Sequence, residues 1–324
     1  MEIFSATLSQ MAVLLIFIAL GFIIQKTGIF PDDFAGGLSK LENYFLIPAV
    51  IIKTFMTNCT LPNLKSQWQC VLYSTVLLAA AIVIGVALAK IFSKSKYERS
   101  IYTYSFTVAN FSFMGIAVVN GAFGDMTVAG TDISYSFVYM MFILPLNLFV
   151  YTAGVAMLTP GRKFFSVRSF INPIFIAIVV GIILGLTNSA ELLSDYAPFI
   201  YSESNSSCVI SSLAACMAPL AMIITGFVIG RYNIVKLLKI KKVYIASAIR
   251  LIIIPAVFIL VLKALNAPYE IQFVALAAYC MPLGLNTVVI PEAYGGDTSL
   301  GASMALISHT LGAITIPLMY LWLM

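Results

Sequence analysis

The chain has 324 residues, of which 61% are hydrophobic and only 10% are charged, and its mean hydropathy is +1.02. Since a soluble domain carries about 25% charged residues, this composition excludes a water-soluble globular protein and predicts a protein of the lipid bilayer. The net charge of +5 does not indicate a nucleic-acid partner, because the basic residues lie in short loops between apolar runs.

Apolar runs of membrane-spanning length follow one another along the whole chain. Each is roughly 20 residues long, which predicts transmembrane helices rather than the shorter alternating strands of a barrel. The first run has no small-residue cleavage site after it, so we expect a helix and not a removed signal. We predict an all-α membrane protein with ten spans, at roughly 3–25, 36–57, 69–92, 100–122, 130–157, 171–188, 206–230, 243–264, 270–292 and 299–322.

Lysine and arginine are distributed unevenly between the two sets of loops. Loops rich in these residues remain in the cytoplasm, so we expect the loops after the first, third, fifth and seventh spans inside, both termini outside, and the protein in the plasma (inner) membrane. The only basic residues of the opposite, outer loops are Lys65 and Lys263. One predicted inner loop departs from the pattern: the loop after the ninth span has no basic residue and holds only Glu292 and Asp297. The basic residues of the predicted inner loops are Lys26, Lys40, Lys90, Lys94, Lys96, Arg99, Arg162, Lys163, Arg168, Arg231, Lys236, Lys239, Lys241 and Lys242.

Two parts of the chain resemble each other. The stretch 48–54 aligns without gaps on 219–225, and 122–124 aligns on 293–295 at the same offset. Five spans separate the copies, so the second copy enters the membrane from the opposite side. Such inverted repeats provide two conformations of comparable energy, one open to each side of the membrane. The two five-helix repeats are predicted at 1–160 and 161–324.

The apolar stretches 109–125 in the fourth span and 280–297 in the ninth are each interrupted by Gly, Asn or Pro. In lipid an interruption leaves backbone groups unpaired, so it persists only where it lines a cavity or binds something. We interpret the stretches as broken helices whose free N–H groups and Asn side chains bind a carboxylate; the alternative is a kink that serves packing alone. Gly115 aligns with Asn286, which predicts breaks at equal depth. The candidate substrate-binding residues are Asn110, Ser112, Gly115, Pro282, Gly284, Asn286 and Thr287.

The motif Asn-x-x-x-Met-Gly-Ile from Asn110 to Ile116, together with Pro-x-x-x-Asn from Pro282 to Asn286, resembles the auxin efflux carrier family. That family includes the plant PIN-type carriers and bacterial malate or malonate permeases, and the resemblance covers essentially the whole chain. It implies a sodium/proton antiporter-like fold in which the fourth and ninth helices cross. It further implies a scaffold of spans 1, 2, 6 and 7, a moving transport domain of spans 3–5 and 8–10, and a homodimer.

The chain departs from the family pattern in two places. It has Ala117 where members commonly have proline, so the fourth-span break is expected to depend on Gly115 and Gly121. Only about a dozen residues join the fifth and sixth predicted spans, whereas many plant members have a long loop there. The short loop favours a bacterial-type carrier.

Few ionisable residues lie within the spans. Neither interrupted stretch has an acid in its interior, which disfavours a cation antiporter. Arg250, in the eighth span, either binds an anion, pairs with an acid, or extends to the cytoplasmic interface. His309, the only histidine, either relays a proton or is a neutral hydrogen-bonded packing residue, which we favour. Lys53, near the outer end of the second span, is expected to extend to the interface.

These features predict a secondary transporter that moves a small organic anion by elevator-type alternating access. A carboxylate such as malate, malonate or an auxin-like weak acid fits best. Its expected partners are that anion, the bilayer and a second copy of the chain, and no nucleic acid. No Walker motif is present, so ATP is not expected, nor is a cofactor or a metal. The cysteines form no metal-binding pattern, and a disulfide among Cys59, Cys70 and Cys208 stays open.

Two other classes of function compete with this interpretation. A membrane receptor or sensor with a transporter fold would bind the anion without net flux. An intramembrane enzyme would need a nucleophile–base pair or a metal cluster at depth, and the lone His309 with scattered serines provides neither. We therefore do not expect an enzyme.

Overall fold

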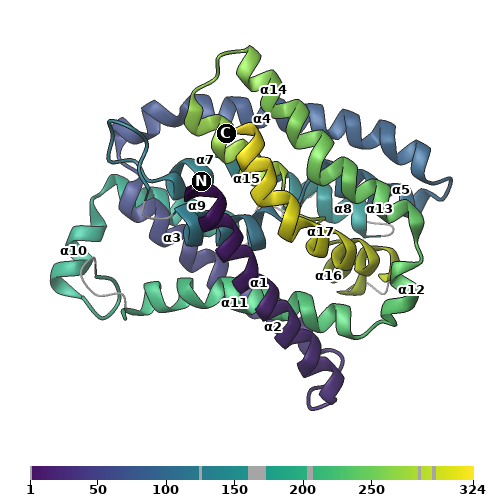
Figure 1. Ribbon diagram of the computed structural model, residues 1–324. Helices are drawn as coiled ribbons and strands as arrows, with labels where there is room; N and C mark the ends of the chain where they lie inside the picture. Colours follow the sequence, from purple (N-terminus) through teal and green to yellow (C-terminus); the bar gives the residue numbers. More distant parts are fainter. Residues whose placement is uncertain (1, 124–125, 160–172, 203–206, 284–285, 294–296) are drawn as a thin grey trace.

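The structure is a computed structural model that describes all residues except 1, 124–125, 160–172, 203–206, 284–285 and 294–296 (Figure 1). The described residues are helical almost throughout, with two isolated β-bridges among them. A helix pairs its backbone N–H and C=O groups within its own segment, as a lipid environment requires. The α-helices are α1 (Glu2–Thr27), α2 (Phe34–Leu41), α3 (Ile47–Asn58), α4 (Leu61–Phe92), α5 (Lys96–Thr107), α6 (Ile116–Phe123), α7 (Tyr135–Phe149), α8 (Val155–Leu158), α9 (Pro173–Leu186), α10 (Ser189–Tyr196), α11 (Val209–Gly230), α12 (Ile234–Leu238), α13 (Lys241–Ala248), α14 (Ile254–Ala264), α15 (Tyr269–Tyr279), α16 (Asn286–Ala293) and α17 (Ser299–Leu323). Among the described residues, four π-helical turns lie next to them: η1 (Glu42–Leu46), η2 (Phe111–Gly115), η3 (Val150–Gly154) and η5 (Ile249–Ile253).

Several helical stretches of the described chain are long and apolar enough to cross a membrane. By length and composition there are six, and the pair α9 and α10, bent by 83°, would make a seventh. The predicted span 36–57 is divided into α2, η1 and α3, while 100–122 and 270–292 each contain a break. The chain is thus an all-helical protein with several apolar spans, and ten spans in two inverted repeats stay a prediction. The six stretches are Leu8–Thr27, Leu61–Phe92, Tyr135–Leu158, Val209–Gly230, Lys241–Ala264 and Ser299–Leu323.

Helices α1 and α11 pack with their backbones in contact (Figure 1). A Cβ atom on Gly226 would lie 1.8 Å from the backbone oxygen of Ile18, and one on Gly21 would lie 2.0 Å from that of Ile223. Small residues allow this close approach between helices in membranes, and any larger side chain would prevent it here. Helix α9 approaches α3 in the same way at Gly185.

The helix contacts fall into two groups. Helix α11 contacts both α1 and α3, and α3 contacts α9. In the other group α4 contacts α5 and α7, α7 contacts α15, and α17 contacts α13 and α14. The groups touch where α1 meets α6 and α17, where α3 meets α7, and where α11 meets η2, α6 and α17.

Helix α15 leads into the centre of the second group. Every residue of 273–283 is buried. The ring of Phe273 lies 4.8 Å from that of Phe123 and 5.1 Å from that of Tyr320, between ring centroids. The backbone beyond α15 is therefore surrounded by protein, where a break in a helix can be satisfied.

Connecting segments meet at two places on the molecule. At one, Lys242 Nζ donates to the carbonyl of Phe92 at 2.7 Å, and the Tyr97 hydroxyl donates to the carbonyl of Asp297 at 2.7 Å. Burial and the nearby Asp297 carboxylate raise the pKa of the Tyr97 phenol, so it remains a neutral donor. At the other, Ser134 Oγ donates to Asn58 Oδ1 at 3.1 Å. All five cysteines are free, so the structure contains no disulfide between them.

Candidate functional site

The two helix interruptions meet inside the protein. After α5 and after α15 the chain leaves the helical conformation, and Ala109 and Leu283 form an isolated antiparallel bridge. The N–H of Asn110 donates to the carbonyl of Pro282 at 2.8 Å, and the N–H of Leu283 donates to Ser308 Oγ at 3.0 Å. Each interruption thus satisfies part of the other's backbone, which lipid cannot do. We call residues 108–110 and 280–283 the crossing.

Both breaks lie earlier than the alignment of Gly115 with Asn286 predicts. Helix α5 ends at Thr107 and η2 begins at Phe111, so Gly115 lies within a helical turn and Gly121 within α6. Asn286 is the first residue of α16 and not the centre of a break. The expectation that the fourth-span break depends on these two glycines is therefore wrong: the unwound backbone is held by its pairing with the ninth span.

Gly115 has a packing role instead. A Cβ atom at this position would lie 2.0 Å from the hydroxyl oxygen of Tyr139. That hydroxyl donates to the carbonyl of Phe111 at 2.9 Å, which is the first residue of η2. Glycine at this position therefore lets Tyr139 reach the backbone next to the crossing.

Asn110 is the most constrained polar side chain of the crossing. It is 2% exposed, and its Nδ2 lies 3.2 Å from Nε2 of His309, whose Nδ1 lies 2.7 Å from the carbonyl of Ala305. A carbonyl only accepts, so His309 carries its proton on Nδ1 and accepts from Asn110 on Nε2. Asn110 Oδ1 is buried without a hydrogen-bond partner among the described residues. Such an atom costs about 1–3 kcal/mol unless a hydrogen-bond donor, such as a ligand hydroxyl, satisfies it; a carboxylate, which only accepts, does not.

The other candidate side chains have separate partners. Asn286 is half-buried, and its Nδ2 donates to the hydroxyl of Tyr104 at 2.9 Å. Ser112 Oγ donates to Asn147 Oδ1 at 3.2 Å. Among the described residues no hydrogen bond joins Asn110 directly to Asn286, so the structure places the two asparagines in neighbouring but distinct networks.

The remaining predicted residues pack on α17. A Cβ atom on Gly312 would lie 3.0 Å from the ring of Pro282, and one on Gly301 would lie 2.4 Å from the backbone oxygen of Thr287. The side chain of Thr287 is fully buried. Gly284 lies outside the described residues.

Arg250, in η5, is fully buried next to the crossing. Its Nη1 donates to the carbonyl of Phe106 at 3.3 Å, and its guanidinium carbon lies 5.3 Å from the ring centroid of Tyr279. Both partners belong to the last turns of helices that end at the crossing, α5 and α15, where the backbone dipole is negative. The side chain therefore does not extend to the interface.

No acid balances this charge within the described residues, and Nε and Nη2 of Arg250 have no hydrogen-bond partner there. A buried charge is costly unless it is paired. The carboxyl ends of the two helices supply part of the compensation, and an anion at the crossing would supply the rest.

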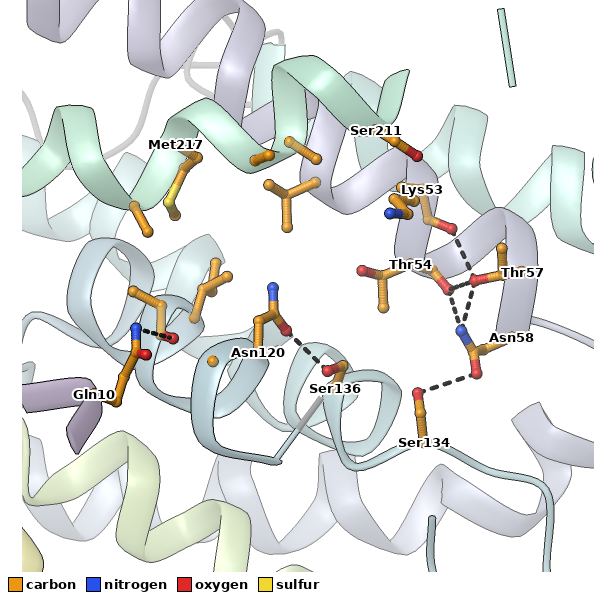
Figure 2. Close-up of a pocket in the computed structure, with 17 residues that line it drawn as sticks. Gln10, Lys53, Thr54, Thr57, Asn58, Asn120, Ser134, Ser136, Ser211 and Met217 are labelled. Atoms are coloured by element: carbon orange, nitrogen blue, oxygen red, sulfur yellow. Dashed lines mark hydrogen bonds between the residues drawn. The ribbon is translucent and has the colours of Figure 1, made fainter. Parts of the chain in front are cut away.

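A cavity of about 530 Å³ with many polar lining residues is bordered by α6, the helix that follows the crossing and η2 in the chain (Figure 2). Helices α3 and α11 form one side, and α6 and the beginning of α7 form the other. Asn120 Oδ1 accepts from Ser136 Oγ at 2.8 Å, and Gln10 Nε2 donates to the carbonyl of Ala117 at 3.3 Å. The cavity is lined by Gln10, Val50, Lys53, Thr54, Thr57, Asn58, Ile116, Ala117, Asn120, Gly121, Ser134, Ser136, Ser211, Ala214, Ala215, Met217 and Ala218.

Sequence reasoning did not identify this cavity or the roles of Tyr139 and Ser308. One signal was available: Asn120 and Ser136 are polar residues inside or beside apolar runs, and such residues usually face a protein interior or water. The partners Ser308 and Tyr139 carry no signal of this kind, because serine and tyrosine are common in membrane helices without a special role.

Comparison with known proteins adds one finding. A family model described as "Membrane transport protein" matches the chain in two segments, residues 6–164 and 161–320. The segments together cover nearly the whole chain. A search of curated proteins finds no match.

Proposed function

The chain belongs to the membrane transport protein family of the auxin efflux carriers, and from this premise we propose that it is a secondary transporter of a small organic anion. It is a multi-pass membrane transport protein. The substrate proposed is a carboxylate such as malate, malonate or an auxin-like weak acid. The mechanism proposed is alternating access of the elevator type.

The observation that carries the choice of an anion is the charge at the crossing. Arg250 is fully buried there, and no acid of the described residues pairs with it. The Nδ2 groups of Asn110 and Asn286 each donate one hydrogen, to His309 and to Tyr104, and each has a second N–H that can donate to an anion. A site with one buried cation, amide N–H groups and the amino end of α16, which begins at Asn286, favours a negatively charged ligand.

The residues have separate roles in this proposal. Asn110, Ser112, Asn286 and Thr287 contact the anion, while Gly115 and Pro282 shape the backbone around it. Arg250 acts through its field, since Coulomb attraction is stronger in a low-dielectric interior. His309 holds the Asn110 amide and is the group through which proton coupling would act.

Burial of the crossing supports a cycle with a conformational step. Asn110 is 2% exposed, so an anion reaches it only after a rearrangement. In this proposal the group of α1, α3, α9 and α11 is the scaffold, the group of α4, α5, α7, α13, α14, α15 and α17 is the transport domain, and the second moves against the first. A homodimer in the plasma membrane with both termini outside belongs to the same proposal.

Purified protein in liposomes provides the test. Uptake of labelled malate, malonate and indole-3-acetate is measured for the parent, for Asn110→Ala and for Asn286→Ala. Asn63→Ala is the control, because Asn63 lies in the first turn of α4 and its side chain bonds the carbonyl of Asn58 at the end of α3, not a group of the crossing. Both crossing variants should lose most of the uptake while the control retains it.

Two outcomes would contradict the proposal in different ways. If both crossing variants transport as well as the parent, the crossing is not the substrate site. If the parent binds an anion but shows no flux, the chain is a receptor or sensor with a transporter fold.

A further inference from the structure

Lys53 places an uncompensated positive charge in the polar cavity of Figure 2. The residue lies in α3, is half-buried and lines the cavity. No lining residue is an acid, and no described side chain pairs with the ammonium group. The expectation that Lys53 simply extends to the membrane interface therefore does not describe its position.

A neutral donor faces the same space. The Asn120 side chain points into the cavity from α6, and its Oδ1 is taken by Ser136 Oγ at 2.8 Å (Figure 2). This bond directs the Nδ2 group, which has no partner among the described residues, toward the open volume. An ammonium and an amide N–H donor that share a cavity without an acid are suited to a carboxylate, which only accepts hydrogen bonds.

We propose that this cavity is an anion-binding site separate from the crossing, and that its ligand presents one carboxylate to Lys53 and Asn120. The volume of about 530 Å³ lies within the range of small-molecule sites, about 300–1,000 Å³. None of the crossing residues lines it. One side of the cavity is nevertheless formed by α6, which continues directly from η2. An anion bound in the cavity therefore lies beside the segment that leads to the crossing.

The first experiment measures the charge of the cavity without any transported ligand. Ala214→Cys in α11 places a thiol in the cavity and leaves the bond between Ser136 and Asn120 intact. It is made in a Cys216→Ser background, because Cys216 is exposed and the other four cysteines are buried. The thiol is reacted with two methanethiosulfonates of similar size, one anionic with a sulfonate and one cationic with a trimethylammonium group. Lys53 should favour the anionic reagent, and Lys53→Gln should lower the anionic-to-cationic rate ratio by about tenfold.

The ratio is the useful quantity because a change in thiol reactivity affects both reagents equally. Lys53→Arg is the matched control, since it retains the charge, and it should keep the parent ratio. Equal ratios for Lys53→Gln and Lys53→Arg would overturn the proposal.

The second experiment tests the carboxylate with benzoate and its uncharged analogue benzamide. Each is added while the Ala214→Cys thiol reacts with the neutral reagent methyl methanethiosulfonate. Benzoate should slow the reaction in the parent and in Lys53→Arg but not in Lys53→Gln, and benzamide should slow it in none. Equal protection by both compounds, or no protection by benzoate, would overturn the proposal.

Asn110→Ala separates this site from the proposed function. The cavity lies beyond the crossing, so benzoate should still protect the thiol in this variant even when uptake is lost. Loss of protection in Asn110→Ala would show that the two sites are one. Protection is measured as the rate of thiol modification and does not require transport. Absence of uptake by the parent protein would therefore contradict only the transport proposal and not this one.

Discussion

Asn110 and His309 are 199 residues apart in the chain, yet the amide Nδ2 of one lies 3.2 Å from the imidazole Nε2 of the other. The contact joins the segment after α5 to the middle of α17. It fixes the orientation of the Asn110 amide, because the His309 Nδ1–H is committed to the carbonyl of Ala305. The side chain proposed to meet the substrate is thus oriented by a residue from the other half of the chain.

Replacement of His309 tests this orientation. His309→Ala should leave the Asn110 amide without a partner, which costs about 1–3 kcal/mol of stability, and uptake should fall with it. Thr310→Ala is the control, since Thr310 is exposed and bonds only the carbonyl of Leu306 in its own helix. Thermal unfolding in detergent and uptake in liposomes are measured together; wild-type uptake by His309→Ala would show that the contact is not needed.

Arg250 distinguishes a functional charge from a structural one. Replacing a buried, incompletely paired charge by an apolar side chain of similar volume is often neutral or stabilising. Arg250→Met should therefore unfold at the same temperature as the parent or higher, while anion uptake falls at least about tenfold. Arg250→Lys, which keeps the charge, should retain part of the uptake. A variant Arg250→Met that transports normally but unfolds early would assign the side chain to the fold alone.

Gly115 and Tyr139 should behave as a coupled pair. Gly115→Ala would place a methyl group 2.0 Å from the Tyr139 hydroxyl, and overpacking of this kind costs about 1–3 kcal/mol. Removing the hydroxyl with Tyr139→Phe creates room but gives up its bond to Phe111. The double variant should be less destabilised than the sum of the two single variants. Additive changes in unfolding free energy would contradict a direct steric contact.

Gly226 tests the backbone contact between α1 and α11. Its Cβ would lie 1.8 Å from the backbone oxygen of Ile18, which cannot move aside as a side chain can. Gly226→Ala should therefore lower the unfolding temperature clearly, with a cost of about 1–3 kcal/mol or more. Gly36→Ala is the matched control in α2, because nothing lies within 4 Å of its Cβ; it should be neutral or stabilising by up to about 1 kcal/mol. Equal unfolding temperatures for the two variants would contradict the close contact.

Much of the general architecture followed from residue patterns. The apolar runs predicted helices for a bilayer, and the Gly, Asn and Pro residues of 109–125 and 280–297 predicted interruptions in two of them. The motifs at Asn110 and Pro282 led to the family that the comparison confirms. These features depend on local composition, which a single sequence displays directly.

The positions of the helix breaks and the environments of Arg250 and Lys53 could not be predicted from residue patterns. The unwound backbone at 108–110 is stabilised by the hydrogen bond from the N–H of Asn110 to the carbonyl of Pro282. Gly115 leaves room for the hydroxyl of Tyr139. The sequence allowed Arg250 to bind an anion, to pair with an acid or to extend to the cytoplasmic interface. Its burial against Phe106 and Tyr279 depends on how the helices pack. Lys53 lines a cavity because α3, α6, α7 and α11 enclose one around it.

The sequence by itself determined that this is a helical membrane transport protein with two interrupted helices, since hydropathy and backbone-breaking residues act within a single segment. Only the tertiary structure decided where those helices open, which polar groups of the described residues are left without partners, and where the charges of Arg250 and Lys53 lie. Each of these depends on pairing between segments far apart in the chain, and the energy of such a pair belongs to neither segment alone.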